Sequence, residues 1–224
     1  MPLTSYGYTC EELRLKLLTA KAAWAAEFID IEKASGIDGA KWEAFQFQLL
    51  NTTERFSIDI KARQIAWSFT AALDAYCDAM VNPGWPHIFV SINLDEAKEK
   101  LRYLRNIIEA TDEPVRPKRF KTDSVTEIEF SDQSRFITHP CRPVRGKAGT
   151  RVYLDEMAHY QQGMDKTIYT AALPATTKAG GYIRIGSSPL GATGLFWEIA
   201  TESIRPFSGF VRRSIPWWNV RALC

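Results

Sequence analysis

Residues 151–160, Arg-Val-Tyr-Leu-Asp-Glu-Met-Ala-His-Tyr, constrain the fold of this chain more than any other stretch. The apolar run 152–154 is typical of a strand that is buried on both faces of a parallel sheet. Asp155 and Glu156 follow where such a strand would emerge at its carboxyl end, which is the edge where open α/β sheets bind ligands. Two adjacent carboxylates there repel each other and lose hydration, so a purely structural role would be costly.

A magnesium nucleotide would explain the two acids. In this interpretation Asp155 holds the hydrated Mg²⁺ and Glu156 polarises the water that attacks the γ-phosphate. A solvated loop with two ordinary acids explains the same residues, because Asp-Glu after an apolar run is common. The stretch alone does not decide between these two interpretations.

Composition excludes several classes of protein. The 224 residues, 46% of them hydrophobic, suffice for one large domain or two small ones, and the net charge of +2 neither demands nor excludes nucleic acid. The four cysteines are scattered without metal-ligand spacing, so neither a zinc site nor a disulfide framework is indicated, and a reducing cytosol is the natural compartment. No signal-peptide pattern and no apolar run of about 18 residues is present.

The predicted helices and strands alternate, which is typical of a parallel sheet with crossover helices. Pro174 is expected to end one of the helices, and the basic stretch 114–122 is either a solvated loop or a DNA contact. We expect an N-terminal helical extension over 1–55 and a core over 56–224. Helices are predicted over 9–33, 42–54, 69–81, 94–110, 164–173 and 194–202, and strands over 56–60, 87–91, 126–130, 135–138, 152–154, 182–185 and 207–215.

Residues 61–68, Lys-Ala-Arg-Gln-Ile-Ala-Trp-Ser, follow the first predicted strand and precede a helix, as a phosphate-binding loop does. The usual pattern, GxxxxGK followed by Ser or Thr, is not met. Ala66 stands in place of the second glycine and Trp67 in place of the lysine, whereas Ser68 keeps the hydroxyl that ligates Mg²⁺. At 186–189, Gly-Ser-Ser-Pro follows another strand and would place hydroxyls at the same sheet edge as Asp155.

Taken together, these pieces resemble the ATPase half of a tailed-phage terminase large subunit, closest to the Mu-like and related families. The resemblance runs from Trp42 to Trp218 and is carried by residues 61–68, 152–156 and 186–189. Arg-Gly-Lys-Ala-Gly at 145–149 and Phe-Trp-Glu at 196–198 fit the same families. The resemblance implies an α/β P-loop NTPase fold of the ASCE type, a mostly parallel sheet flanked by helices.

The resemblance also implies roles for the loop. Some terminases carry a deviant Walker A loop with the basic residue at its start, the position of Lys61 here, and a lysine there can still reach the β- and γ-phosphates. Arg63 is by analogy the cis-acting arginine. A surface lysine and an arginine that anchors the loop are the alternatives. The nucleotide-binding residues would then be Gln46, Lys61, Ala62, Arg63, Gln64, Ile65, Ala66, Trp67 and Ser68, with Glu156, Lys61 and Arg63 catalytic and with Ser68 and Asp155 on the metal.

Three further assignments follow from the resemblance. Gln46 or Gln48 corresponds to the glutamine that reads adenine, with Gln46 preferred; a solvent-facing helix glutamine is the alternative. Ser187 and Ser188 correspond to the coupling motif that senses the γ-phosphate, although capping of a turn before proline explains them equally. Arg142 and Arg145 are candidates for a trans-acting arginine.

The expected function is Mg²⁺-dependent hydrolysis of ATP that drives double-stranded DNA into a viral prohead, in the cytoplasm of a host that carries the phage or prophage. Portal protein, small terminase subunit and further copies in a ring are the expected partners. The chain ends at Cys224, so no C-terminal nuclease domain and no nuclease activity are expected. The alternative, motivated by Ala66 and Trp67, is a degenerate NTPase-fold module that binds DNA or assembly partners. A helicase-like remodelling ATPase would need strand-separation motifs that the sequence lacks.

Overall fold

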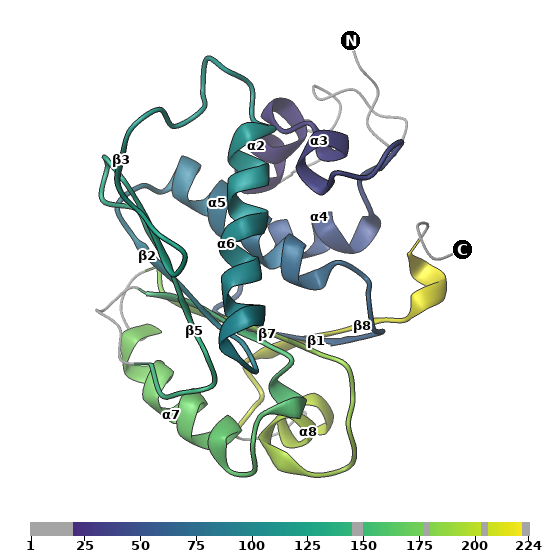
Figure 1. The fold of residues 1–224 in the computed structure, drawn as a ribbon. Helices are drawn as coiled ribbons and strands as arrows, with labels where there is room; N and C mark the ends of the chain where they lie inside the picture. The colour runs from purple at the N-terminus through teal and green to yellow at the C-terminus, as the bar shows by residue number, and fades with distance from the viewer. Residues whose placement is uncertain (1–19, 145–149, 177–179, 203–205, 221–224) are drawn as a thin grey trace.

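The computed structural model describes residues 20–144, 150–176, 180–202 and 206–220. Within them one eight-stranded sheet has the order β3-β4-β5-β2-β6-β7-β1-β8 (Figure 1). The six strands from β5 to β8 in this order run parallel, and β3 and β4 add an antiparallel edge. The strands are β1 (Phe56–Lys61), β2 (Pro86–Val90), β3 (Phe120–Asp123), β4 (Glu127–Phe130), β5 (Arg135–His139), β6 (Arg151–Asp155), β7 (Tyr182–Ser187) and β8 (Phe210–Ile215).

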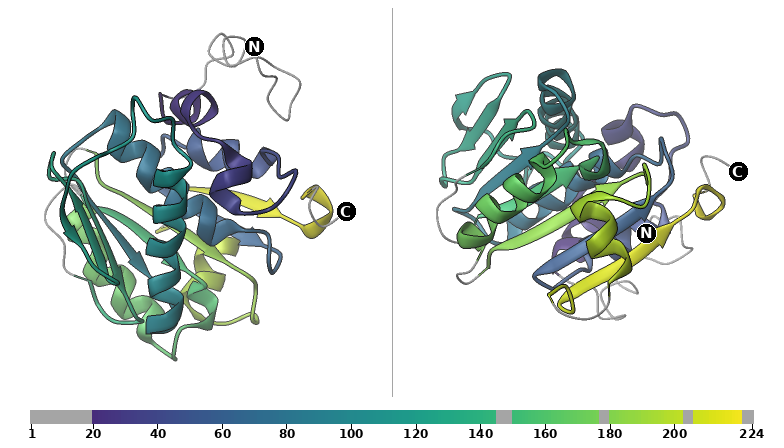
Figure 2. Two further views of the ribbon diagram at one scale, coloured as in Figure 1. Left: turned by 45° about the horizontal axis from the view of Figure 1, so that its top comes forward. Right: turned by 90° about the horizontal axis from the view of Figure 1, so that it is seen from below.

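Helices cover both faces of the sheet, as parallel strands require (Figures 1 and 2). One face carries α2 to α6 and the other carries α7 and α8, and each layer buries its own apolar cluster against the strands. This is the predicted fold class. The helices are α2 (Ala20–Phe28), α3 (Ile31–Ser35), α4 (Ala44–Leu50), α5 (Trp67–Val81), α6 (Leu94–Glu109), α7 (Met164–Thr176) and α8 (Gly194–Thr201), with short 3-10 turns η1 (Met157–His159) and η2 (Trp217–Asn219).

The alternation of side chains along β6 decides where its acid points. Tyr153 belongs to the cluster under α5 and α6, whereas Val152 and Leu154 belong to the cluster under α7 and α8. Because successive strand residues face opposite sides, Asp155 is on the α5 and α6 side, where it meets residues of both helices.

A buried polar network joins the N-terminal helices to the sheet. Asp74 of α5 is fully buried, and its Oδ1 lies 2.5 Å from Nζ of Lys21 on α2. Its Oδ2 accepts hydrogen bonds from the hydroxyls of Tyr153 (2.8 Å) and Tyr182 (3.3 Å). Burial first, and then the nearby Asp74 charge, raise the pKa of both tyrosines, so the hydroxyls remain donors. Within the part of the chain that the structure describes, the cation that pairs with this carboxylate therefore comes from α2, before β1.

Several predicted boundaries are wrong, and for two of them the structure shows the physical reason. The helix expected to run to Lys33 ends at Phe28, because Asp30 N donates to Ala110 O and the Asp30 carboxylate then caps α3. The Thr9 capping box lies outside the described residues. Pro174 lies inside α7, whose last turn continues to Thr176; the buried Thr176 packs against the returning chain at Gly181.

A further correction concerns the basic stretch 114–122, in which no strand was predicted. Its end forms the edge strand β3, where Phe120 pairs with Phe130 of β4 and their rings meet edge to face at 5.5 Å. Lys118 pairs with Glu113 and Lys121 with Glu129. A DNA contact by this stretch stays a prediction. In the described parts of the chain, no helix has both the length and the apolar character needed to cross a membrane.

Candidate nucleotide-binding site

The loop 61–68 leaves β1 at Lys61 and enters α5 at Trp67. Gln64 and Ala66 both have φ of 59°, in the left-handed region that favours glycine. Within the described residues, no backbone N–H of residues 63–66 donates a hydrogen bond. A run of unpaired N–H groups leading into a helix N-terminus is a ready anion-binding site.

Trp67 is the residue that breaks the usual loop pattern, and the structure gives its departure a physical reason. The indole is 1% exposed and points beneath the loop, where Nε1 donates to Asp59 Oδ2 at 2.7 Å. Gly186 of β7 leaves the space for it, since a Cβ there would lie 2.2 Å from the ring. Arg213 Nε binds the other oxygen of Asp59 at 2.6 Å. Trp67 therefore supports the loop from below.

Asp155, at the end of β6, meets both the loop and α6. Its Oδ2 accepts a hydrogen bond from Ser68 Oγ at 2.5 Å and lies 2.5 Å from Nζ of the buried Lys100. Its Oδ1 is buried and has no hydrogen-bond partner within the described part of the chain. One oxygen of this carboxylate is thus engaged twice, and the other is left unpaired.

Glu156 follows in a left-handed conformation, with φ of 55°, and turns towards the loop. Its Oε1 forms an ion pair with Lys61, and its Oε2 accepts from Ser187 Oγ (3.2 Å) and Ser188 N (3.0 Å). Burial favours the neutral acid, but the hydrogen bond and charge of Lys61 outweigh burial, and with the Ser188 N–H they hold the pKa of the Glu156 carboxyl below its ordinary value. Glu156 is therefore ionised at neutral pH.

The residues at this edge suit a magnesium ion. The described residues contain no group of three or more His, Cys, Asp or Glu side chains able to hold a metal by themselves. Mg²⁺ does not require one, because it usually binds through one or two carboxylates, waters and substrate phosphates. The unpaired Asp155 Oδ1 and the neighbouring Ser68 hydroxyl fit that set.

A cavity of about 650 Å³ opens beside the loop. Lys61, Gln64 and Ser68 line one side with Glu156, and Tyr103 of α6 and the segment 31–46 line the other. A volume of this size is ordinary for a cofactor site. The loop and Glu156, far apart in sequence, therefore meet at one cavity, and Asp155 lies next to it through its hydrogen bond with Ser68.

Gln46 is buried at 4% exposure and lines this cavity, whereas Gln48 is exposed outside it. The Gln46 Oε1 accepts a hydrogen bond from the backbone N–H of Glu43 at 2.8 Å, which caps α4. Its amide nitrogen has no partner within the described residues. The adenine-reading role of either glutamine stays a prediction, with Gln46 in the better position.

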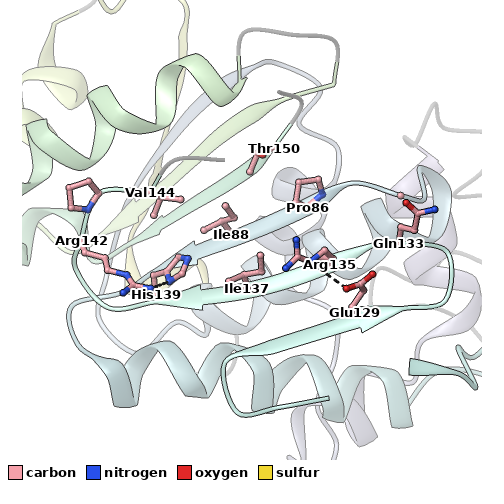
Figure 3. Close-up of a pocket in the computed structure, with 12 residues that line it drawn as sticks. Pro86, Ile88, Glu129, Gln133, Arg135, Ile137, His139, Arg142, Val144 and Thr150 are labelled. Atoms are coloured by element: carbon pink, nitrogen blue, oxygen red, sulfur yellow. Dashed lines mark hydrogen bonds and ion pairs between the residues drawn. The ribbon is translucent and has the colours of Figure 1, made fainter. Parts of the chain in front are cut away.

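The arginine assignments fit less well. The Arg63 side chain is exposed, does not line the cavity and has no ion pair within the described residues. Arg142 lines a second cavity, of about 660 Å³, on the α7 side of the sheet over β2 and β5 (Figure 3). There its Nη2 lies 2.6 Å from His139 Nδ1. Arg145 lies outside the described residues. The described residues that line the second cavity include no pair of adjacent acids and no loop with unpaired backbone N–H groups like those of the first site.

Two residues of the first site escaped the sequence reasoning. Lys100 lies between the buried Ala97 and Leu104 at helical spacing. A lysine among the apolar positions of this helix is the sequence feature that could have indicated a buried, paired charge. His159 of η1 has its Nε2 2.9 Å from Ser188 Oγ and 3.7 Å from Glu156 Oε2. A lone histidine shortly after two acids carried no such signal.

The sequence matches no protein-family model and none of the curated proteins. Solved structures do match. The large terminase ATPase domain of Thermus phage P74-26 is 16% identical, with a TM-score of 0.64 over 81% of this chain and 84% of that one. The bacteriophage HK97 large terminase is 12% identical, with a TM-score of 0.67 over 87% of this chain and 43% of that one.

A third match is the large terminase of a thermophilic bacteriophage in complex with ATP-γ-S. It is 11% identical, with a TM-score of 0.64 over 82% of this chain and 47% of that one. This chain thus spans less than half the length of the HK97 protein and of the ATP-γ-S-bound protein. At such identities the likeness concerns the fold alone, and it confirms the predicted mostly parallel sheet flanked by helices, with further helices at the N-terminal side.

Proposed function

We propose that this chain binds and hydrolyses ATP with Mg²⁺ and thereby powers the translocation of double-stranded DNA, as the ATPase part of a packaging motor. One observation carries the proposal: Lys61 and Ser68, from the two ends of one loop, contact Glu156 and Asp155, the adjacent acids at the end of β6. A loop with free N–H groups, a lysine, a hydroxyl and a carboxylate at one cavity, with a second carboxylate on that hydroxyl, suits phosphoryl transfer from a nucleotide.

The loop binds the phosphates in this proposal. The N–H groups of residues 63–66 hold phosphate oxygens, and the ammonium of Lys61 leaves Glu156 to neutralise the β- and γ-phosphates. Lys61 thus acts from the start of the loop, as in the deviant Walker A type. Arg63 turns from solvent towards the transferring group. Ser68 and Asp155 hold Mg²⁺, which when bound neutralises charge on the phosphate oxygens.

Glu156 is the general base. It is ionised at neutral pH, and once Lys61 has moved to phosphate its Oε1 is free to orient water. Ser187 and Ser188 donate hydrogen bonds to the other oxygen, Oε2. They thereby connect the position of the Glu156 carboxylate to β7 and the segment that follows. Gln46, on α4, contacts the adenine ring of the nucleotide. The proposed partners are double-stranded DNA, a portal protein, a small subunit and further copies of the chain in a ring. The proposed location is the inside of a host cell.

The experiment is Glu156→Gln, which keeps the size of the side chain and removes its basicity. We expect MgATP to bind the variant as it binds the native chain, while hydrolysis falls by about 100-fold or more. Glu198→Gln, at an exposed position of α8, is the matched control and should hydrolyse ATP at the native rate. Equal hydrolysis by the native chain and Glu156→Gln would refute the mechanism.

A second candidate is a module of the same fold that docks DNA or partners without hydrolysis. Two observations favour it: Ala66 takes a left-handed conformation where glycine is usual, and the buried Trp67 leaves no lysine next to Ser68. Calorimetric titration with MgATP separates the candidates. Absence of binding at millimolar nucleotide would favour the module, whereas saturable binding together with turnover of the bound ATP would exclude it.

A further inference from the structure

Lys100 is a buried cation at the edge of the proposed metal site. It lies on α6, its side chain is 1% exposed, and its Nζ lies 2.5 Å from Asp155 Oδ2. Among the described residues, the other carboxylate near it is Glu96, at 3.8 Å, whose side chain is mostly exposed. An ammonium taken out of water needs a partner, and here the partner is the acid that we assign to Mg²⁺.

The position itself does not call for a charge. Ala97, Leu101 and Leu104 share this face of α6 and are completely buried. A leucine or methionine at position 100 would fill the same space without losing hydration, and replacement of a buried ion pair by apolar residues is often neutral or stabilising. The charge of Lys100 therefore has its use at Asp155.

Each of the two acids at the end of β6 faces one lysine. Lys61 pairs with Glu156, and Lys100 pairs with Asp155. Asp155 and Lys100 are both almost fully buried, so little water screens this second pair. A divalent ion that approaches the unpaired Asp155 Oδ1 meets an ammonium on the other oxygen of the same carboxylate.

We propose that Lys100 is the resident counter-cation of Asp155: it holds the carboxylate beside Ser68 when no divalent ion is bound, and it competes with that ion for the site. This inference rests on the proposed metal role of Asp155. Lys100 is a positioning residue, which acts on the nucleotide only through Asp155. Its charge sets the concentration of divalent ion at which the site fills, because removing a positive charge next to a cation site increases affinity for the cation.

The test measures Mn²⁺ binding to the nucleotide-free chain by electron paramagnetic resonance, a readout that is independent of hydrolysis. Lys100→Gln removes the charge and keeps an N–H donor for Asp155. We expect it to bind Mn²⁺ about tenfold more tightly, or better, than the native chain. The matched control is Lys98→Gln, on the same helix but half exposed and paired with Asp95, which should leave Mn²⁺ affinity unchanged.

A double variant tests whether the effect depends on Asp155. Adding Asp155→Asn to Lys100→Gln should abolish the gain in Mn²⁺ affinity. If Lys100→Gln folds poorly, Lys100→Met should show the same gain in Mn²⁺ affinity. Unchanged or weaker Mn²⁺ binding in folded Lys100→Gln or Lys100→Met would overturn the proposal, as would a gain that survives Asp155→Asn. Failure of the native chain to bind MgATP would instead count against the proposed function, since the Mn²⁺ titration contains no nucleotide.

Discussion

Gly186 is the position where one methyl group should have the largest effect. It lies in β7 between Asp59 of β1 and Asp155 of β6, in register with both. A Cβ at this position would lie 2.2–2.4 Å from three ring atoms of Trp67, and real contacts are never so close. The indole is buried and bound to Asp59, so any movement of the ring breaks that hydrogen bond. Gly186→Ala must therefore move either the ring or the strand.

The cost follows from those contacts. Overpacking a core costs about 1–3 kcal/mol. Loss of the bond from Trp67 Nε1 to the Asp59 carboxylate adds about 1.5–3 kcal/mol. We expect Gly186→Ala to lose about 3–5 kcal/mol of unfolding free energy, which for a chain of this size lowers Tm by on the order of 10 °C.

Urea unfolding followed by circular dichroism measures the loss, and nucleotide affinity should fall with it because the loop rests on Trp67. Gly191→Ala is the control, since no atom lies within 4 Å of a Cβ there. A Gly186→Ala chain within about 1 kcal/mol of the native stability would show that Trp67 does not fill the space over β7 as described.

Two further predictions concern the loop. In the native chain the lowered pKa of Glu156 contributes stability above the unfolded pKa, and this contribution is lost as pH falls through the folded value. Without the ammonium of Lys61, burial is the largest influence left on the Glu156 carboxyl. Lys61→Met should therefore raise the pKa of Glu156 above its ordinary value and reverse the pH dependence of this contribution to stability. A carbon NMR titration of the glutamates that finds the Glu156 pKa still lowered would contradict this prediction. Ala66→Gly relieves a left-handed residue, worth about 1–2 kcal/mol, against about 0.5–1 kcal/mol of added unfolded-state entropy. A net gain of up to about 1 kcal/mol should appear in urea unfolding, and a loss would show that Ala66 is not strained.

The strands and most helices could be predicted because their apolar periodicity is local. β6 and β7 read as short apolar runs, and the Asn93 cap of α6 is visible as a polar residue three positions before Glu96. The errors occur where distant backbone decides. The break after Phe28 depends on hydrogen bonds with the chain beyond α6, and β3 forms only because β4 is beside it.

The same distinction between local sequence and distant contacts applies to the residues of the site. Ser68 and Asp155 could be proposed from residue type and order, since both follow strands at one sheet edge. Lys100 could not be placed beside them, because α6 reaches Asp155 through the packing of its face on the sheet. Nor could the sequence show that Trp67 turns under the loop, which depends on Gly186, more than 100 residues away.

The pairing of Lys21 with Asp74 bears on how the chain could be shortened. A protein that started at β1 would leave the Asp74 carboxylate at the centre of α5 with two tyrosine hydroxyls and no cation. Stranding one member of a buried ion pair costs about 3–5 kcal/mol, a large part of what holds an ordinary domain together. The helices that precede the sheet therefore supply a charge whose removal would cost a large part of the stability of the core.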